Sequence, residues 1–329
     1  VICAAALIVA LPAAQAQPST HDDELLVGFR AGVSAQIRDG VIRHSGAAAV
    51  EVFGRETRIV RVRVSAQAMG EMTHRFMRQP EVAFVERNAI LAPALVPDDP
   101  QYASQWHLPR IRAPQAWELT RGAPAAVIAI LDSGVDPLHP EFAGKLVAGA
   151  NTYDKSGSTA DQHGHGTRMA GVAAARSDNG LGIAGVAGQS PIMPVRVTDR
   201  KGQATSASIA KGIVWAAEHG ARVVNLSLEG VAGSATVRAA AEYAFGRGAL
   251  VVAPSGNCGC MDPSPDSPFV LSVAATDAAD RAAAFSTAGD FVDLAAPGTD
   301  IPTTAMFGLY MGGSGTSDRK STRLNSSHT

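Results

Sequence analysis

The sequence predicts an α/β fold with a mostly parallel central sheet, preceded by a smaller α+β unit. From Ala113 onward, short apolar runs alternate with amphipathic stretches, a pattern typical of parallel strands that are buried on both faces and joined by helices. Residues 22–92 instead follow the order strand–helix–strand–strand–helix–strand, which suits a small sheet covered by two helices. The Pro-rich stretch from Ala92 to Pro100 separates the two patterns and is expected to be an exposed connector.

Periodicity and turn residues predict the individual elements. In the smaller unit, strands are expected at Glu24–Arg30, Ala48–Phe53, Thr57–Val64 and Val82–Glu86, with helices at Val33–His44 and Ser65–Arg78. In the larger unit, strands are expected at Ala126–Leu131, Ile192–Val197, Arg222–Leu228, Ala249–Ala253 and Phe269–Ala275, with helices from near His165 and at Ser206–His219 and Ala235–Phe245.

Length and composition restrict the function classes. The chain has 329 residues, of which 46% are hydrophobic and 5% aromatic, and its formal net charge is −2. This is the composition of a globular protein with room for a large core. The near-neutral charge gives no electrostatic reason to expect nucleic acid or an anionic membrane as a partner.

The N-terminal residues have the features of a secretory signal. Val1 to Pro12 are almost wholly apolar, and Ala14-Gln15-Ala16 is a small-x-small triplet that suits signal peptidase. The run is too short to span a bilayer comfortably. We therefore expect residues 1–16 to be a signal peptide whose basic n-region is missing, and the protein to be secreted, extracellular or periplasmic, without a stable membrane anchor. A buried helix is the alternative.

The three cysteines do not form a disulfide framework. Cys3 would leave with the signal peptide, while Cys258 and Cys260 stand in a Cys-Gly-Cys motif. The latter pair is compatible with a local disulfide, with free thiols, or with other partners. Two cysteines without suitably spaced histidines do not favour a zinc site.

Four polar residues stand where chemistry is expected. Asp132 follows an apolar strand, and His165 begins a helix of small residues, so the helix can bring an imidazole close to the carboxylate. An imidazole can accept a proton from a hydroxyl near neutral pH. Ser317 follows the glycine-rich stretch 312–315, which permits a sharp turn. Asn257 follows another apolar strand, where its carboxamide can donate to an oxyanion.

The motifs around these residues resemble those of subtilisin-like serine proteases, the subtilase family or peptidase S8. The similarity spans residues 96–317 and implies a three-layer fold around the mostly parallel sheet. It rests on four motifs in the family's order: Asp132-Ser133-Gly134-Val135-Asp136, His165-Gly166-Thr167, Ser255-Gly256-Asn257 and Gly315-Thr316-Ser317.

The resemblance implies a secreted serine endopeptidase that hydrolyses peptide bonds through an acyl-enzyme on Ser317. His165 would be the general base and acid, Asp132 would orient it, and Asn257 with the Ser317 N–H would form the oxyanion hole. The chemistry requires no cofactor, and protein or peptide substrates are the expected partners. A peptide-binding scaffold without catalysis and an esterase are the alternatives.

The resemblance also implies a substrate-binding surface. Gly202, Ser227, Leu228 and Gly230 stand where the family pairs substrate backbone as an added strand. Glu229 stands where the family usually has glycine. Its carboxylate either lies at the rim of the substrate pocket and favours a basic P1 residue, or faces water. We favour the second interpretation, since exposure is the default for glutamate.

Structural calcium is a further implication of the resemblance. Asp99, Glu141 and Asn179 fall where the family places oxygen ligands, which are the ligands that Ca²⁺ prefers. Acidic and amide residues near glycine are also common in any surface loop. The sequence alone favours neither a calcium site nor ordinary surface-loop residues.

Residues 17–95 resemble the I9-type inhibitory prosegment of the same family, a ferredoxin-like α+β unit. It would act as an intramolecular inhibitor, with its tail at Phe84–Asn88, and be removed by cleavage between about Asn88 and Pro97. An independent binding domain is the alternative. The catalytic domain would then span residues 96–317.

Residues 318–328 coincide, residue for residue, with one reading frame of a common sequencing adapter. We interpret residues 318–329 as an artefact and exclude them from the fold; a natural polar tail is the alternative. Ser317 keeps its identity, because any third base after TC encodes serine. The helix that should follow Ser317 is then missing, so the 329-residue chain itself is expected to be inactive.

Overall fold

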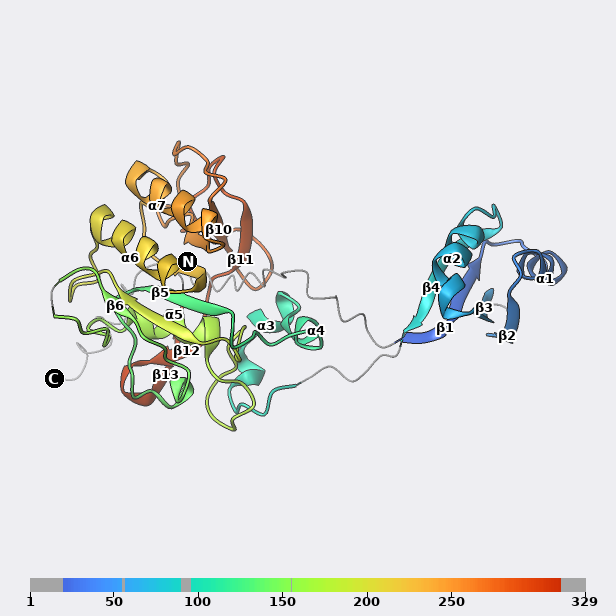
Figure 1. Ribbon diagram of the computed structural model, residues 1–329, viewed down its shortest axis with the longest axis horizontal. Helices are drawn as coiled ribbons and strands as arrows, with labels where there is room; N and C mark the ends of the chain where they lie inside the picture. Colours follow the sequence, from blue (N-terminus) through green and yellow to red (C-terminus); the bar gives the residue numbers. More distant parts are fainter. Residues whose placement is uncertain (1–19, 55–56, 90–95, 155, 315–329) are drawn as a thin grey trace. The chain divides into compact units, whose positions relative to one another are not determined.

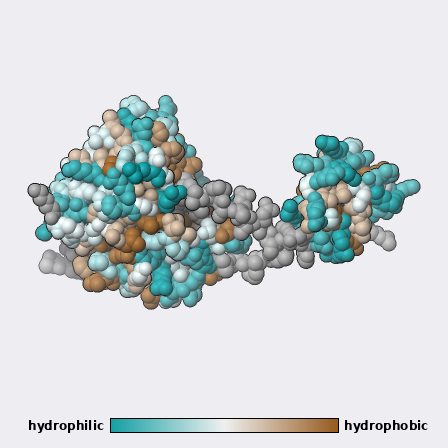
Figure 2. Space-filling model, in the orientation of Figure 1, coloured by the Kyte–Doolittle hydropathy of each residue, from teal (hydrophilic) through white to brown (hydrophobic). Residues whose placement is uncertain are grey.

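The computed structural model describes residues 20–314 apart from 55–56, 90–95 and 155 (Figure 1). The described residues belong to two compact units, 20–89 and 96–314. Polar residues cover most of the visible face of each unit, with small groups of apolar residues between them (Figure 2). Within the described residues, no helix is long and apolar enough to cross a membrane.

The smaller unit is an α+β fold with the predicted order of elements. Its strands form an antiparallel sheet in the order β2-β3-β1-β4. The short helix η1 and helix α2 together occupy the single helix expected at Ser65–Arg78. The elements are β1 (Thr20–Phe29), α1 (Ala35–His44), β2 (Ala48–Val52), β3 (Ile59–Arg63), η1 (Ala66–Ala68), α2 (Met69–Met77) and β4 (Val82–Ala89).

Both the strands and the helices of this unit contribute apolar side chains to its core. Leu25, Val27 and Phe29 alternate along β1 and are buried, because successive side chains of a strand point to opposite faces. Helix α2 contributes apolar side chains three and four positions apart, which share one helical face. These residues are Met69, Met72 and Phe76, and they belong to the same hydrophobic cluster.

The larger unit is built on a parallel sheet, as predicted. Its described strands run in the order β11-β10-β9-β8-β5-β7-β6, and every pairing is parallel. A separate antiparallel hairpin, β12-β13, packs on helix α5 (His165–Ala174). The strands are β5 (Val127–Asp132), β6 (Ala150–Asn151), β7 (Ile192–Arg196), β8 (Ala221–Leu226), β9 (Leu250–Pro254), β10 (Val270–Thr276), β11 (Leu294–Pro297), β12 (Ile301–Ala305) and β13 (Leu309–Gly313).

Helices cover both faces of this sheet and complete three layers (Figure 1). Ala129 and Leu131 of β5 pack in the cluster that contains α6 and α7. Ile128 and Ile130, which point the other way, pack in the cluster that contains α5. The helices of this unit are α3 (His107–Arg110), α4 (Ala113–Trp117), α5 (His165–Ala174), α6 (Ser206–Glu218) and α7 (Ala235–Gly246).

The strands that the sequence does not predict are short or polar. β6 has two residues, β11 is half exposed, and β12 carries adjacent threonines. Thr303 and Thr304 of β12 are nevertheless buried, because their hydroxyls donate to the backbone of α5 at Arg168 and Thr167. Hydrogen bonds to helix carbonyls therefore replace the apolar alternation that would have identified this strand.

The strand order reverses at one edge of the sheet. The chain leaves β5 for β6 and β7 on one side, then returns to β8 on the other side. Because all the strands are parallel, their carboxyl ends share an edge. In open α/β sheets, ligands bind outside this edge where the strand order reverses, which here is between β5 and β8.

His107 makes the stability of the larger unit pH-dependent. Its side chain is buried, and neither ring nitrogen has a hydrogen-bond partner among the described residues. Burial lowers the pKa of His107 to about 4. The unfolded chain therefore binds a proton between pH 6.5 and pH 4 that the folded chain excludes.

We predict that His107→Leu reduces acid destabilisation. On going from pH 7 to pH 4.5, the wild type should lose about 2.5 kcal/mol more unfolding free energy than the variant, because only the wild type has this histidine to protonate. Urea unfolding at the two pH values measures the difference. Equal losses in both proteins would contradict the assignment.

Candidate active site

A buried carboxylate faces an imidazole at the carboxyl edge of β5. Asp132 is the last residue of β5 and is 1% exposed. Its Oδ2 and Oδ1 atoms lie 2.8 and 2.9 Å from Nδ1 of His165, and Oδ1 also accepts a hydrogen bond from the Ser133 N–H. Nδ1 therefore carries the proton that binds Asp132, and Nε2 points away from the carboxylate. The structure brings together the two residues that the sequence predicts as partners.

Asp161, which the sequence analysis does not identify, holds the start of α5. Its carboxylate accepts hydrogen bonds from the side chains of Ser133 and Thr167. It also accepts hydrogen bonds from the backbone N–H groups of His163, Gly164 and Thr167. Burial opposes the charged form, but these hydrogen bonds outweigh it and hold the pKa of Asp161 below its ordinary value.

The Asp161 network ties His165 to β5. Ser133, the residue after Asp132, donates to Asp161 and accepts from the Gly166 N–H. The first turn of α5 and the end of β5 are thus joined through one hydroxyl. Helix-start rules miss Asp161 because the helix begins at His165, four residues later, with Gly164 as its N-cap.

Glycines allow α5 to approach its neighbours closely. A Cβ on Gly166 would lie 2.0 Å from the Gly134 carbonyl oxygen, and one on Gly171 would lie 2.1 Å from Thr304 Oγ1. Neither distance is possible for a real side chain. The prediction that small residues permit close packing of this helix is confirmed, and the same packing sets the depth at which His165 reaches Asp132.

Asn257 lies at the same edge of the sheet, three residues after β9. Its Nδ2 donates a hydrogen bond to the carboxylate of Glu229, which follows β8. Glu229 is exposed, as expected, yet its carboxylate does not only face water. The expected exposure of Glu229 is confirmed, and the hydrogen bond with Asn257 is a contact that the sequence did not predict.

The loop after Asn257 is held by a disulfide and by Thr287. Cys258 and Cys260 are bonded to each other, which decides between the alternatives for this pair. The Thr287 hydroxyl accepts from the Cys258 N–H at 3.1 Å, and the Thr287 N–H donates to the Gly256 carbonyl at 3.0 Å. The backbone on both sides of Asn257 is thereby tied down.

The predicted substrate-binding residues lie in two segments. Gly202 is in a turn with positive φ, and a Cβ there would lie 3.2 Å from the His163 ring. Ser227, Leu228 and Gly230 follow β8, next to Glu229. The predicted nucleophile, Ser317, lies outside the described residues, which end at Ser314 after β13.

The predicted calcium ligands come together on the larger unit. Asn179 Nδ2 donates to Glu141 Oε2 at 2.9 Å. Asp99 is 3% exposed, and its Oδ1 has no hydrogen-bond partner among the described residues. Burial and then the nearby negative charge of Glu141 raise the pKa of Asp99 to about 6. A buried acceptor without a donor, next to a second carboxylate, fits a hard cation.

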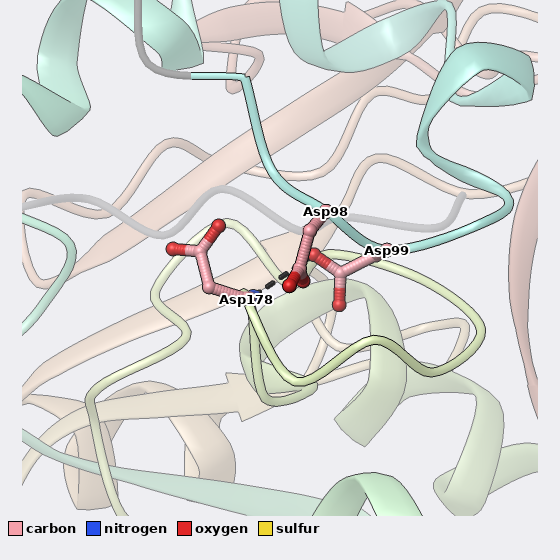
Figure 3. Close-up of side chains that lie close together, drawn as sticks. All are labelled: Asp98, Asp99 and Asp178. Carbon is pink, nitrogen blue, oxygen red and sulfur yellow. Dashed lines mark hydrogen bonds between the residues drawn. The ribbon is translucent and has the colours of Figure 1, made fainter.

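Two further carboxylates lie beside Asp99. Asp98 belongs to the same segment, Asp178 comes from the loop after α5, and the Asp178 N–H donates to Asp99 (Figure 3). Arg121 forms an ion pair with Asp178, so this carboxylate already has a cationic partner. Asp98 and Asp178 stand outside the ligand positions that the resemblance implies, and only the fold brings them beside Asp99.

We predict that Asp161→Ala destabilises the protein by about 3 kcal/mol or more, because several buried donors lose a charged acceptor at once. Asp277→Ala is the control: Asp277 also accepts from two backbone N–H groups, but it is only half-buried and its remaining partner is the exposed side chain of Arg281. This control should cost clearly less, because water can replace the lost acceptor. Urea unfolding of both variants measures the difference. Equal losses of unfolding free energy would show that the Asp161 network contributes no more to stability than the hydrogen bonds of Asp277.

Comparisons with known proteins agree with this geometry. The family model described as the subtilase family, Peptidase S8, matches residues 124–327. Thermitase from Thermoactinomyces vulgaris is 42% identical over 224 residues, which cover 67% of this chain and 80% of thermitase. A thermophilic serine proteinase from Bacillus sp. (strain AK1) is 35% identical over 300 residues, covering 89% of this chain and 74% of that proteinase.

Solved structures give the same result. A protease from Pseudoalteromonas arctica PAMC 21717 superposes with a TM-score of 0.60 at 28% identity, covering 68% of this chain and 82% of that chain. A cold-adapted subtilisin-like serine proteinase superposes with a TM-score of 0.52 at 28% identity, covering 60% and 72% of the two chains. With a parallel sheet of the expected type and these relatives, the chain belongs to the subtilase family, peptidase S8, and is a serine-type endopeptidase.

Proposed function

We propose that the protein is a secreted endopeptidase that uses Asp132, His165 and Ser317 as its catalytic triad and Asn257 in the oxyanion hole. The hydrogen bond from His165 Nδ1 to the buried Asp132 is the observation that carries this proposal. It selects one tautomer of the imidazole and stabilises the imidazolium that forms during proton transfer. Subtilases need no cofactor for this chemistry, and proteins or peptides are the substrates.

The reaction would proceed in two halves. Ser317 Oγ attacks the scissile carbonyl carbon while its proton passes to His165 Nε2. The resulting oxyanion accepts hydrogen bonds from Asn257 Nδ2 and the Ser317 N–H. The C–N bond then breaks as His165 gives its proton to the leaving amine. Water hydrolyses the Ser317 ester by the same route, with His165 taking the proton of the water and returning it to Ser317 Oγ.

A non-catalytic peptide-binding scaffold and an esterase are the competing functions. The scaffold would have no need to bury Asp132 against His165, because burying a carboxylate costs free energy. An esterase would use the same triad, so it differs from an endopeptidase in its substrate alone.

The N-terminal part of the chain would serve secretion and maturation. We assign residues 1–16 to a signal peptide, residues 17–95 to a prosegment that acts as an intramolecular inhibitor until it is removed, and residues 96–317 to the catalytic domain. The match to the Bacillus proteinase is longer than the larger unit, so it reaches into residues before Val96. This supports a shared precursor organisation.

A structural Ca²⁺ ion would lie at Asp99, Glu141 and Asn179. Asp99 and Glu141 would supply carboxylate oxygens. Asn179 would supply its carboxamide oxygen, which accepts from the Leu181 N–H in this structure, so its carboxamide would have to turn from the orientation in which Nδ2 donates to Glu141. The cation would offset the burial and the repulsion from Glu141 that together raise the pKa of Asp99. Its role is structural, since these residues are separate from the Asp132–His165 pair.

We predict that a fluorophosphonate probe labels Ser317 and that Ser317→Ala abolishes the labelling. Asp132→Asn should lower kcat about 10⁴-fold, because the imidazole then adopts the wrong tautomer. Cleavage of a denatured protein separates a protease from an esterase. Labelling that persists in Ser317→Ala would overturn the assignment of the nucleophile.

These assays use the protein expressed from its gene, with the genomic codons that follow Ser317. We propose that residues 318–328 derive from adapter sequence, so the 329-residue chain should show no turnover under the same conditions. Measurable peptide cleavage by that chain, or the same residues in a genomic read, would contradict this part of the proposal.

We predict that the protein saturated with calcium, at concentrations far above Kd, has a Tm about 10 °C higher than the protein with a chelator. Asp99→Asn should remove this effect, because the buried ligand loses its charge. Asp98→Asn is the matched control and should leave the effect in place. An unchanged Tm with chelator would exclude the site, and equal effects of both variants would favour the Asp98–Asp99–Asp178 cluster instead.

A further inference from the structure

Glu229 is a charged residue in the proposed active site with no role in the reaction described above. Its carboxylate accepts a hydrogen bond from Asn257 Nδ2, the group assigned to the oxyanion. Within the described part of the chain, no lysine, arginine or histidine pairs with Glu229. An uncompensated negative charge therefore lies beside the position where negative charge develops in the reaction.

We propose that Glu229 makes the enzyme select substrates with a basic P1 residue, lysine or arginine, and that it also orients the Asn257 carboxamide. The proposal rests on the function proposed above. Two properties of Glu229 carry it: the contact with Asn257, and the position of Glu229 after β8, beside the strand that ends in Asp132.

The geometry of a peptide bond puts P1 within reach of Glu229. The scissile carbonyl belongs to the P1 residue, so the P1 Cα lies roughly 5 Å from the nitrogen that binds the carbonyl oxygen. Glu229 contacts that same nitrogen. A long basic side chain spans the remaining gap, whereas the leaving amine and the P1′ residue lie toward His165, which protonates the amine.

The electrostatics favour a cationic substrate. A carboxylate next to the oxyanion hole opposes the developing negative charge, and a substrate cation at P1 offsets this repulsion and pairs with Glu229. Glu229 is exposed, so salt should screen the interaction and weaken the selection. An apolar P1 residue gains nothing from the carboxylate and leaves the repulsion in place.

The hydrogen bond also gives Glu229 a positioning role. The backbone around Asn257 is held by Thr287 and by the Cys258–Cys260 disulfide. These contacts fix the main chain but leave the carboxamide torsions open. Glu229 supplies an acceptor for one amide hydrogen, so the other is free to donate to the oxyanion.

Two substitutions separate charge from hydrogen bonding. Glu229→Gln keeps an acceptor for Asn257 and removes the charge, while Glu229→Gly removes both. The measurement is kcat/KM for peptides that differ only in Arg or Phe at P1, at low and high salt. Glu242→Gln, an exposed glutamate on α7, is the matched control for the change in net charge.

We expect the wild type to prefer Arg over Phe, and Glu229→Gln to reduce the ratio of the two kcat/KM values about tenfold or more. Glu229→Gly should reduce the ratio similarly and also lower kcat for the Phe peptide. High salt should reduce the ratio in the wild type but not in Glu229→Gln. Glu242→Gln should behave as the wild type.

An Arg/Phe ratio that is the same in the wild type and in Glu229→Gln would overturn the inference, including the case where both rates fall together. Fluorophosphonate labelling of Ser317 in each variant tests the proposed function separately, because the probe has no P1 side chain. A protein that is labelled but does not discriminate refutes only the role of Glu229. A protein that is not labelled refutes the proposed function itself.

Discussion

The hydrogen bond between the buried carboxylate of Asp132 and the imidazole of His165 is the contact on which the rest of the site depends. A buried carboxylate is unfavourable unless donors satisfy it. Here the donors are His165 and the Ser133 N–H. His165, which satisfies the carboxylate, is also the residue proposed to transfer protons. Helix α5 must approach β5 closely, and Gly166 permits that approach.

Much of the fold could be predicted because its elements follow simple periodicities. The apolar run of β5 is buried on both faces and its last residue is Asp132, as expected for a central parallel strand. The hairpin β12-β13 could not be predicted in this way. Thr303 and Thr304 are buried through hydrogen bonds to α5, and such long-range satisfaction leaves no local pattern in the sequence.

The candidate site likewise contains residues that motifs predict and contacts that only the fold creates. Asp132, His165 and Asn257 stand in motifs, so sequence reasoning could find them. Asp161 and the contact from Asn257 to Glu229 depend on which loops meet at the sheet edge, and only the fold supplies that information. Glu229 illustrates the difference: its exposure could be predicted from residue type, whereas its partner could not.

The proposed reaction separates charge within the site. Asp132 would stabilise a cation on His165, and Asn257 would stabilise an anion on the substrate. Glu229 would add a negative charge beside that anion, which a cationic substrate would compensate. The disulfide and Thr287 hold the backbone next to Asn257.

The most direct test of the triad and oxyanion hole is a crystal structure of the protein from the natural gene after reaction with a phosphonate inhibitor. We expect phosphorus bonded to Ser317 Oγ, a phosphoryl oxygen about 3 Å from Asn257 Nδ2, and His165 Nδ1 still bound to Asp132. An adduct on another residue, or a phosphoryl oxygen that faces solvent away from Asn257, would contradict it.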